Sequence, residues 1–134
     1  GVPGIRLIDD DPRITRRAHH FFPFRIDLAY LGVPRARFMD ALRAEGVPSM
    51  IGYDRPLYKN PLFQRAWQSG PASCPVSCPF HGSLVDYTQV SCPVCAEVVE
   101  DTLWLFHTLL LADTPAVEAI VTAFRKVIDH RAEL

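Results

Sequence analysis

Three consecutive segments place the strongest limits on how this chain can fold. Residues 16–27 are dominated by aromatic residues and isoleucine, which is typical of a β-strand, and Pro23 predicts that part of this strand is an edge or a bulge. A helix is predicted from Pro34, because proline suits the first helical position, to a left-handed cap at Gly46. A loop bounded by prolines and rich in aromatic residues follows at residues 56–63. The order is therefore strand, capped helix and loop.

The rest of the chain adds short strands and helices to this beginning. Residues 103–108 are apolar on both faces, which predicts a central strand covered on both sides. Thr114 and Pro115 form a cap and first turn, and apolar residues at helical spacing follow them to residue 128. Further elements are expected as short strands at 5–8 and 49–52 and as helices at 62–68 and 93–101. This order predicts an α+β fold, in which a small, mostly antiparallel sheet of three to four strands packs with helices.

Length and proline content predict the domain organisation. A chain of 134 residues is expected to form one compact domain, residues 1–134. Residues 53–91 are a loop-rich excursion within it, because prolines recur there. A stretch of this kind is either functional or a plain surface excursion, and both interpretations are open.

Charge and hydropathy exclude several classes of function. The net charge is −1 and no run of Lys and Arg occurs, so the sequence offers no electrostatic basis for binding nucleic-acid phosphates. The most apolar stretch, residues 103–112, is far shorter than the roughly 20 residues of a membrane-spanning helix. No signal peptide is visible, and four cysteines are too few for a disulfide-framed secreted scaffold. We therefore expect a cytoplasmic protein that binds neither nucleic acid nor membrane.

Taken in order, a set of motifs resembles the DegT/StrS-like family of pyridoxal-phosphate-dependent sugar aminotransferases. The resemblance runs from about Ile5 to the C-terminus. The motifs that carry it are His20-Phe21-Phe22-Pro23-Phe24-Arg25, Gly32-Val33-Pro34, Ala44-Glu45-Gly46-Val47-Pro48, Gly52-Tyr53, Pro56-Leu57-Tyr58, Cys92-Pro93-Val94-Cys95, Leu105-Phe106-His107-Thr108 and Ala123-Phe124-Arg125-Lys126-Val127. The resemblance implies the C-terminal small domain of a fold type I transaminase. The start at Gly1 rather than at Met agrees with a piece of a longer chain.

The same resemblance implies a reaction for the parent protein. It would transfer an amino group from glutamate or glutamine to a keto-sugar or keto-cyclitol, with pyridoxal phosphate bound mainly by a large domain outside this chain. The two lysines, Lys59 in a loop and Lys126 in an amphipathic helix, do not fit a desolvated Schiff-base amine. We therefore expect this fragment alone to be inactive, and assign it no catalytic or cofactor-binding residue. A sugar dehydratase parent stays open, and family members usually form homodimers.

Five residues are candidates for substrate binding, because cationic and hydroxyl side chains hold a carboxylate or sugar hydroxyls. They are Tyr53, Arg55, Tyr58, Lys59 and His107. By resemblance, both of the segments that carry them border the cleft. Each has a structural alternative: Tyr58 as a packed ring, Arg55 and Lys59 as surface cations, and His107 as a half-buried histidine with one backbone partner.

The four cysteines raise an alternative function. Cys74 and Cys78, followed by Cys92 and Cys95, resemble a four-thiolate zinc site, with His81 as a possible substitute ligand. The three-residue gap between the first two, and the position of Pro93 at a predicted helix start, weaken this interpretation. A zinc-stabilised binding module, a disulfide within either pair, and free thiols therefore all stay open.

Overall fold

The computed structural model describes residues 1–9, 11–66 and 86–134. Helix α2 (Arg35–Ala44) directs Phe38, Met39 and Leu42 into the interior. It ends as the sequence predicts, because Gly46 adopts a left-handed φ of 82°. The N–H of Gly46 donates to the carbonyl of Arg43, and the next N–H reaches Leu42, a pattern that satisfies the last carbonyls of a helix. The predicted start is one residue early, since Pro34 is the N-cap.

The long C-terminal helix α5 (Thr114–Asp129) presents one apolar stripe. Ala123, Phe124, Val127 and Ile128 on this stripe are buried. The predicted cap needs a correction: the capping side chain is that of Asp113, which accepts the N–H of Ala116 at 3.1 Å. A carboxylate is a better N-cap than a hydroxyl here, because the partial positive charge at the helix N-terminus attracts it.

Four strands form one antiparallel sheet in the order β1-β2-β4-β3. They are β1 (Ile5–Leu7), β2 (Phe21–Ile26), β3 (Ser49–Met50) and β4 (Thr102–Phe106). The register pairs Phe24 with Leu103 and Met50 with Trp104. The predicted α+β class and strand number are therefore confirmed.

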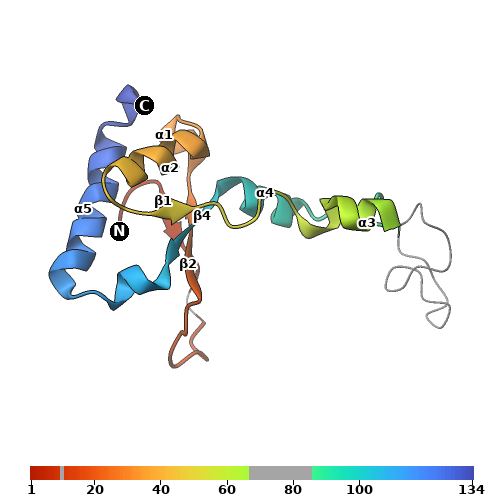
Figure 1. Ribbon diagram of the computed structural model, residues 1–134, viewed down its shortest axis with the longest axis horizontal. Coiled ribbons are helices and arrows are strands. Elements are labelled where there is room, and N and C mark those ends of the chain that lie inside the picture. Colours follow the sequence, from red (N-terminus) through yellow and green to blue (C-terminus); the bar gives the residue numbers. More distant parts are fainter. Residues whose placement is uncertain (10, 67–85) are drawn as a thin grey trace. The chain divides into compact units, whose positions relative to one another are not determined.

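The core lies on one face of this sheet, under α2 and α5 (Figure 1). Phe24 and Leu103 from the central strands are buried against the two helices. The ring of Phe124 meets that of Phe24 edge-on, with centroids 5.2 Å apart, and that of Phe38 at 6.3 Å. Edge-to-face contacts of this kind add to the free energy of simple area burial.

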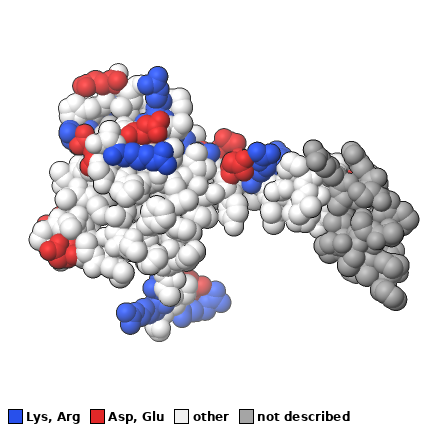
Figure 2. Space-filling view, viewed as in Figure 1, with Lys and Arg blue, Asp and Glu red and all other residues white. Residues whose placement is uncertain are grey.

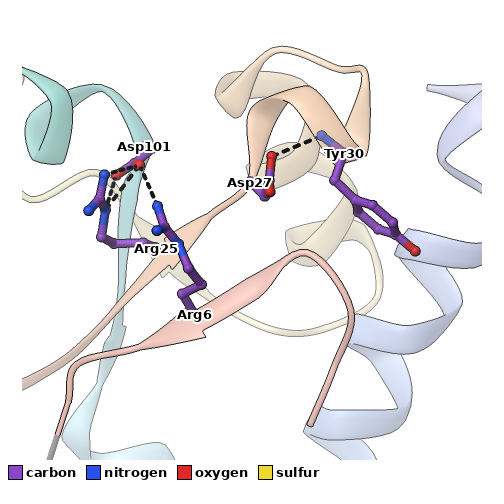
Figure 3. A network of polar contacts seen from close by, with 5 residues as sticks. All are labelled: Arg6, Arg25, Asp27, Tyr30 and Asp101. Carbon is purple, nitrogen blue, oxygen red and sulfur yellow. Dashed lines mark hydrogen bonds and ion pairs between the residues drawn. The ribbon is translucent and has the colours of Figure 1, made fainter.

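The strand predicted at residues 16–27 differs from the structure. The predicted strand at 16–27 is shortened to Phe21–Ile26, and the short helix α1 (Leu28–Leu31) that follows it was not predicted. Its N-cap Asp27 accepts the N–H of Tyr30 (Figure 3). Pro23 lies in β2 beyond the last residue paired with β1, so one side of the strand is an edge there.

The predicted central strand at 103–108 also needs correction. Strand β4 ends at Phe106, and residues 107–111 form a 3-10 helix. It is central, but only one of its faces is fully covered: Leu103 and Leu105 are buried, whereas Phe106 is 40% exposed. An apolar sequence on both faces therefore does not require two buried faces.

The chain divides into two compact units, which we call the sheet unit (Gly1–Gly52 with Asp101–Leu134) and the loop unit (Tyr53–Glu100). The loop unit contains a 3-10 turn at Leu57–Lys59, helix α3 (Pro61–Ala66) and most of helix α4 (Pro93–Asp101). The predicted bounds of α4 are confirmed, and the helix predicted at 62–68 corresponds to α3. That residues 1–134 are one small domain of a longer chain, with a loop-rich excursion at 53–91, stays a prediction.

Charged side chains of the sheet unit form small separate groups on the face shown in Figure 2. The pair between Lys126 and Glu45 links α5 to the end of α2, with the ammonium 2.7 Å from the carboxylate. Among the described residues, no helix combines the length and the hydropathy that crossing a membrane requires.

Candidate functional site

An ion-pair network fixes the point where the chain re-enters the sheet unit after the loop unit (Figure 3). Asp101 is the last residue of α4, and its side chain is only 11% exposed. Arg25 on β2 donates through Nε at 2.8 Å and through Nη2 at 2.5 Å, and the Nη2 atom of Arg6 lies 3.7 Å away. The sequence places an acidic residue unfavourably at a helix C-terminus. The two guanidinium groups compensate for this position.

A close backbone approach fixes the point where the chain leaves the sheet unit. A Cβ atom added to Gly52 would lie 2.1 Å from Cε2 of the Trp104 indole on β4. That indole stacks on Phe21, with centroids 5.0 Å apart. The described glycines with positive φ are Gly4, Gly32 and Gly46, so Gly52 is required for space rather than for backbone conformation.

Within the loop unit, hydrogen bonds and ring contacts hold the segment around Tyr58. The side-chain amide of Gln64 on α3 donates to the carbonyl of Tyr58 at 2.7 Å and to that of Tyr87 at 3.2 Å. The rings of Phe63 and Tyr87 lie 5.1 Å apart. The Tyr58 hydroxyl accepts the backbone N–H of Cys92 at 3.5 Å. Tyr58 is thus half-buried and is hydrogen-bonded to α3 and to the residue that directly precedes α4.

The other candidates in this segment are more exposed. Tyr53 is 65% exposed. The ammonium of Lys59 lies 6.0 Å from the centroid of the Tyr58 ring. Arg55 donates to a carboxylate oxygen of Asp54 from Nε at 2.9 Å and from Nη2 at 2.5 Å. The structure therefore brings Tyr58 and Lys59 together and gives Arg55 an acidic neighbour.

The Arg55–Asp54 pair leads to a testable pH dependence. The hydrogen bonds from Arg55 hold the pKa of the Asp54 carboxyl below its ordinary value of 3.8. Because the folded-state pKa is the lower one, the pair stabilises the fold above the ordinary pKa, and this contribution is lost as the pH falls through the lowered value. We expect Arg55→Gln to raise the Asp54 pKa towards 3.8, as measured by carboxyl NMR titration.

The matched control for this titration is a second exposed pair. Arg13 lowers the pKa of Asp11 in the same way. Arg13→Gln should raise the pKa of Asp11 and leave that of Asp54 unchanged. An Asp54 pKa that does not respond to Arg55→Gln would contradict the assignment.

His107 belongs to the sheet unit, where it follows β4 as the first residue of a 3-10 helix. Its Nδ1 lies 2.8 Å from the carbonyl oxygen of His20, and the two imidazole rings stack with centroids 6.3 Å apart. A half-buried ring with a backbone partner is the structural alternative foreseen for this residue. Its contact with substrate stays a prediction.

Comparison with known proteins begins with a negative result: no protein-family model matches the chain. Two curated proteins are each 32% identical to it, over 122 and 133 residues. They are an L-glutamine:3-amino-2,3-dideoxy-scyllo-inosose aminotransferase of Streptoalloteichus tenebrarius and an L-glutamine:2-deoxy-scyllo-inosose aminotransferase of Streptomyces kanamyceticus. The alignments cover 89% and 98% of this chain, but only 28% and 30% of those proteins. The chain is homologous to L-glutamine:keto-cyclitol aminotransferases.

A solved structure supports the fold of this aminotransferase homologue. The crystal structure of 3-amino-5-hydroxybenzoic acid synthase matches 96% of the chain with a TM-score of 0.66, at 23% identity. The match covers 30% of that protein. The predicted α+β fold is therefore confirmed, as is the predicted resemblance to sugar and cyclitol aminotransferases.

The lysines of the aminotransferase homologue do not fit a cofactor site. The ammonium of Lys126 is held by the carboxylate of Glu45 at 2.7 and 2.8 Å, and Lys59 is exposed. An amine that forms a Schiff base is desolvated or lies next to another cation. Lys126 is paired with a carboxylate and Lys59 is exposed, so neither lysine meets this requirement. Pyridoxal phosphate therefore finds no anchoring lysine among the described residues.

The zinc alternative gains no support. Cys92 and Cys95 are exposed free thiols. Cys74, Cys78 and His81 lie outside the described residues. No group of three or more His, Cys, Asp or Glu side chains within residues 1–9, 11–66 and 86–134 is arranged to hold a metal ion.

Sequence reasoning missed the residues that position the candidates. The side-chain amide of Gln64 donates to two backbone carbonyls, and Cys92 donates its backbone N–H to the Tyr58 hydroxyl. Contacts that involve backbone groups cannot be predicted from the type of the side chain. The close approach of Gly52 to Trp104 is weakly indicated by the sequence, because an isolated glycine near a strand is typical of sites where the backbone lies close to another group.

Proposed function

We propose that this chain is the substrate-binding and cleft-closing domain of a pyridoxal-phosphate-dependent aminotransferase. The parent protein would transfer an amino group from glutamine, or from glutamate, to a keto-cyclitol or related keto-sugar. The observation that carries the proposal is the near-complete alignment of this chain with glutamine:scyllo-inosose-type aminotransferases, of which it spans less than a third. A cytoplasmic location and a homodimeric parent are parts of the same proposal.

The loop unit supplies suitable chemistry for binding. The Tyr58 hydroxyl, which accepts a hydrogen bond from Cys92, keeps its own O–H for a substrate hydroxyl or carboxylate. The ammonium of Lys59 lies beside the same ring and provides a compact positive charge. Arg55 donates to Asp54 from Nε and Nη2. Its Nη1 hydrogens would then bind a carboxylate of the amino donor. Together these groups bind and orient; none of them is proposed to form a bond with the substrate.

The cofactor belongs to the part of the protein outside this chain. Pyridoxal phosphate supplies the electron sink for amino transfer in such enzymes. Because the described residues provide no anchoring lysine, we assign no step of the cofactor chemistry to this chain.

The experiment uses the whole protein that contains this chain. With glutamine and scyllo-inosose as substrates, we expect formation of an amino-cyclitol together with the visible absorbance of bound pyridoxal phosphate. Tyr58→Phe should lower kcat/KM by about tenfold, the effect of one hydrogen bond to a polar or charged group. Arg13→Gln, in the loop between β1 and β2, is the matched control and should leave the rate unchanged.

Two results would contradict the proposal. A whole protein that binds no pyridoxal phosphate would remove the enzyme class. A whole protein that binds pyridoxal phosphate but catalyses loss of water from the sugar, with no transfer of an amino group, would be a dehydratase.

A further inference from the structure

We propose that Cys92 and Cys95 are a reversible dithiol–disulfide pair at the start of α4, and that its oxidation weakens the hydrogen bond between Cys92 and Tyr58. The thiols of Cys92 and Cys95 take no part in the proposed binding function. Two cysteines separated by two residues have the spacing of the redox-active pairs of disulfide oxidoreductases.

The structure places the two cysteines at the start of α4, one just before the helix and one in its first turn. The carbonyl of Cys92 accepts the N–H of Ala96 at 3.0 Å, so Cys92 directly precedes the helix, and Cys95 lies within its first turn. Both side chains are exposed and both thiols are free. A small disulfide in solution can therefore reach either sulfur.

The spacing indicates which residue must move when the bond forms. Side chains three residues apart on a helix have Cβ atoms about 5–6 Å apart. A disulfide needs about 3.5–4.5 Å. Cys95 is held within the helix, whereas the N–H of Cys92 has no partner inside the helix and instead donates to the Tyr58 hydroxyl at 3.5 Å. Cys92 is therefore the residue that shifts, and its bond to Tyr58 is the contact that responds.

The oxidation is an ordinary thiol–disulfide exchange, with a low-molecular-weight disulfide as the oxidant. One cysteine thiolate attacks a sulfur of the oxidant, whose S–S bond breaks and whose other half leaves as a thiolate with the electron pair. The second cysteine thiolate attacks the mixed disulfide and releases the other half. The two cysteines are thereby oxidised, one oxidant disulfide is reduced to two thiols, and the two cysteine protons pass to the thiolates released.

The test uses the full chain with Cys74→Ser and Cys78→Ser, so that Cys92 and Cys95 are its remaining thiols. The protein is equilibrated with oxidised and reduced glutathione at a series of ratios, trapped by alkylation and mapped by mass spectrometry. We expect an intrachain Cys92–Cys95 linkage that forms and disappears with the ratio. Peptide maps of the wild-type chain should show the same linkage, which keeps the test valid if the two serines disturb folding.

A second measurement tests the connection to Tyr58. Because the hydrogen bond exists in the reduced form, Tyr58→Phe should shift the equilibrium towards the disulfide by about two- to fivefold. Tyr30→Phe, in the sheet unit, is the control and should leave the equilibrium unchanged. The inference is overturned if only mixed disulfides with glutathione or linkages between chains form, or if Tyr58→Phe behaves like its control.

Discussion

Asp101→Asn is expected to lower the free energy of unfolding of the sheet unit by about 2–4 kcal/mol, because it leaves a largely buried guanidinium without its carboxylate. The side chains of Arg25 and Asp101 are 23% and 11% exposed, so water replaces the lost interaction poorly. Asparagine keeps the shape of the aspartate and removes only its charge. Urea denaturation of the full chain, followed by far-UV circular dichroism, measures the effect.

The control for this prediction is an exposed ion pair of the same residue types. Asp40 lies 3.5 Å from Arg43 on α2, and its side chain is 67% exposed. Asp40→Asn should change the free energy of unfolding by less than about 0.5 kcal/mol. Combining Asp101→Asn with Arg25→Met should recover part of the loss, since the partly buried guanidinium is then removed as well. Equal effects of Asp101→Asn and Asp40→Asn would show that the network does not stabilise the fold.

Gly52→Ala is expected to destabilise the sheet unit by about 1–3 kcal/mol through overpacking. The new methyl group would lie 2.1–2.7 Å from three atoms of the Trp104 indole. The ring is rigid and is stacked on Phe21, so it cannot yield in the way that the end of a flexible side chain can. The same denaturation experiment measures the loss.

Two further variants separate steric overlap from backbone strain. Gly32 has a positive φ of 70° and open space around its Cβ position, so Gly32→Ala reports backbone strain alone. Gly52→Ala combined with Trp104→Leu should lose less stability than the sum of the two single changes, because the smaller side chain vacates the space of the indole. Strictly additive losses would place the cause of the Gly52→Ala effect elsewhere.

The features that the sequence predicts correctly depend on neighbours along the chain. The cap at Gly46 needs only a positive φ and the carbonyls of the preceding turn. The start of α4 follows from Pro93, because proline suits the first helical position. Local chemistry of this kind is visible in one sequence.

The features that it does not predict join residues far apart in the chain. Asp101 meets Arg25 across 76 positions, and Cys92 meets Tyr58 across 34. Nothing in the residues around the acidic end of α4 indicates that its partner is an arginine on another element. The substrate-binding candidates rest on side-chain chemistry and on resemblance, and the structure adds the contacts that position Tyr58.

The pairing of β3 with β4 has a consequence for how such a protein can diversify. Met50 on β3 pairs with Trp104 on β4. The chain therefore leaves the sheet at the end of β3 and re-enters it at the start of the adjacent strand β4, about 5 Å away. A long excursion whose ends are that close resembles an oversized hairpin turn, and its length adds little to the cost of closing it. Residues 53–100 can thus be shortened, extended or grafted from a relative while the hydrophobic interior stays intact.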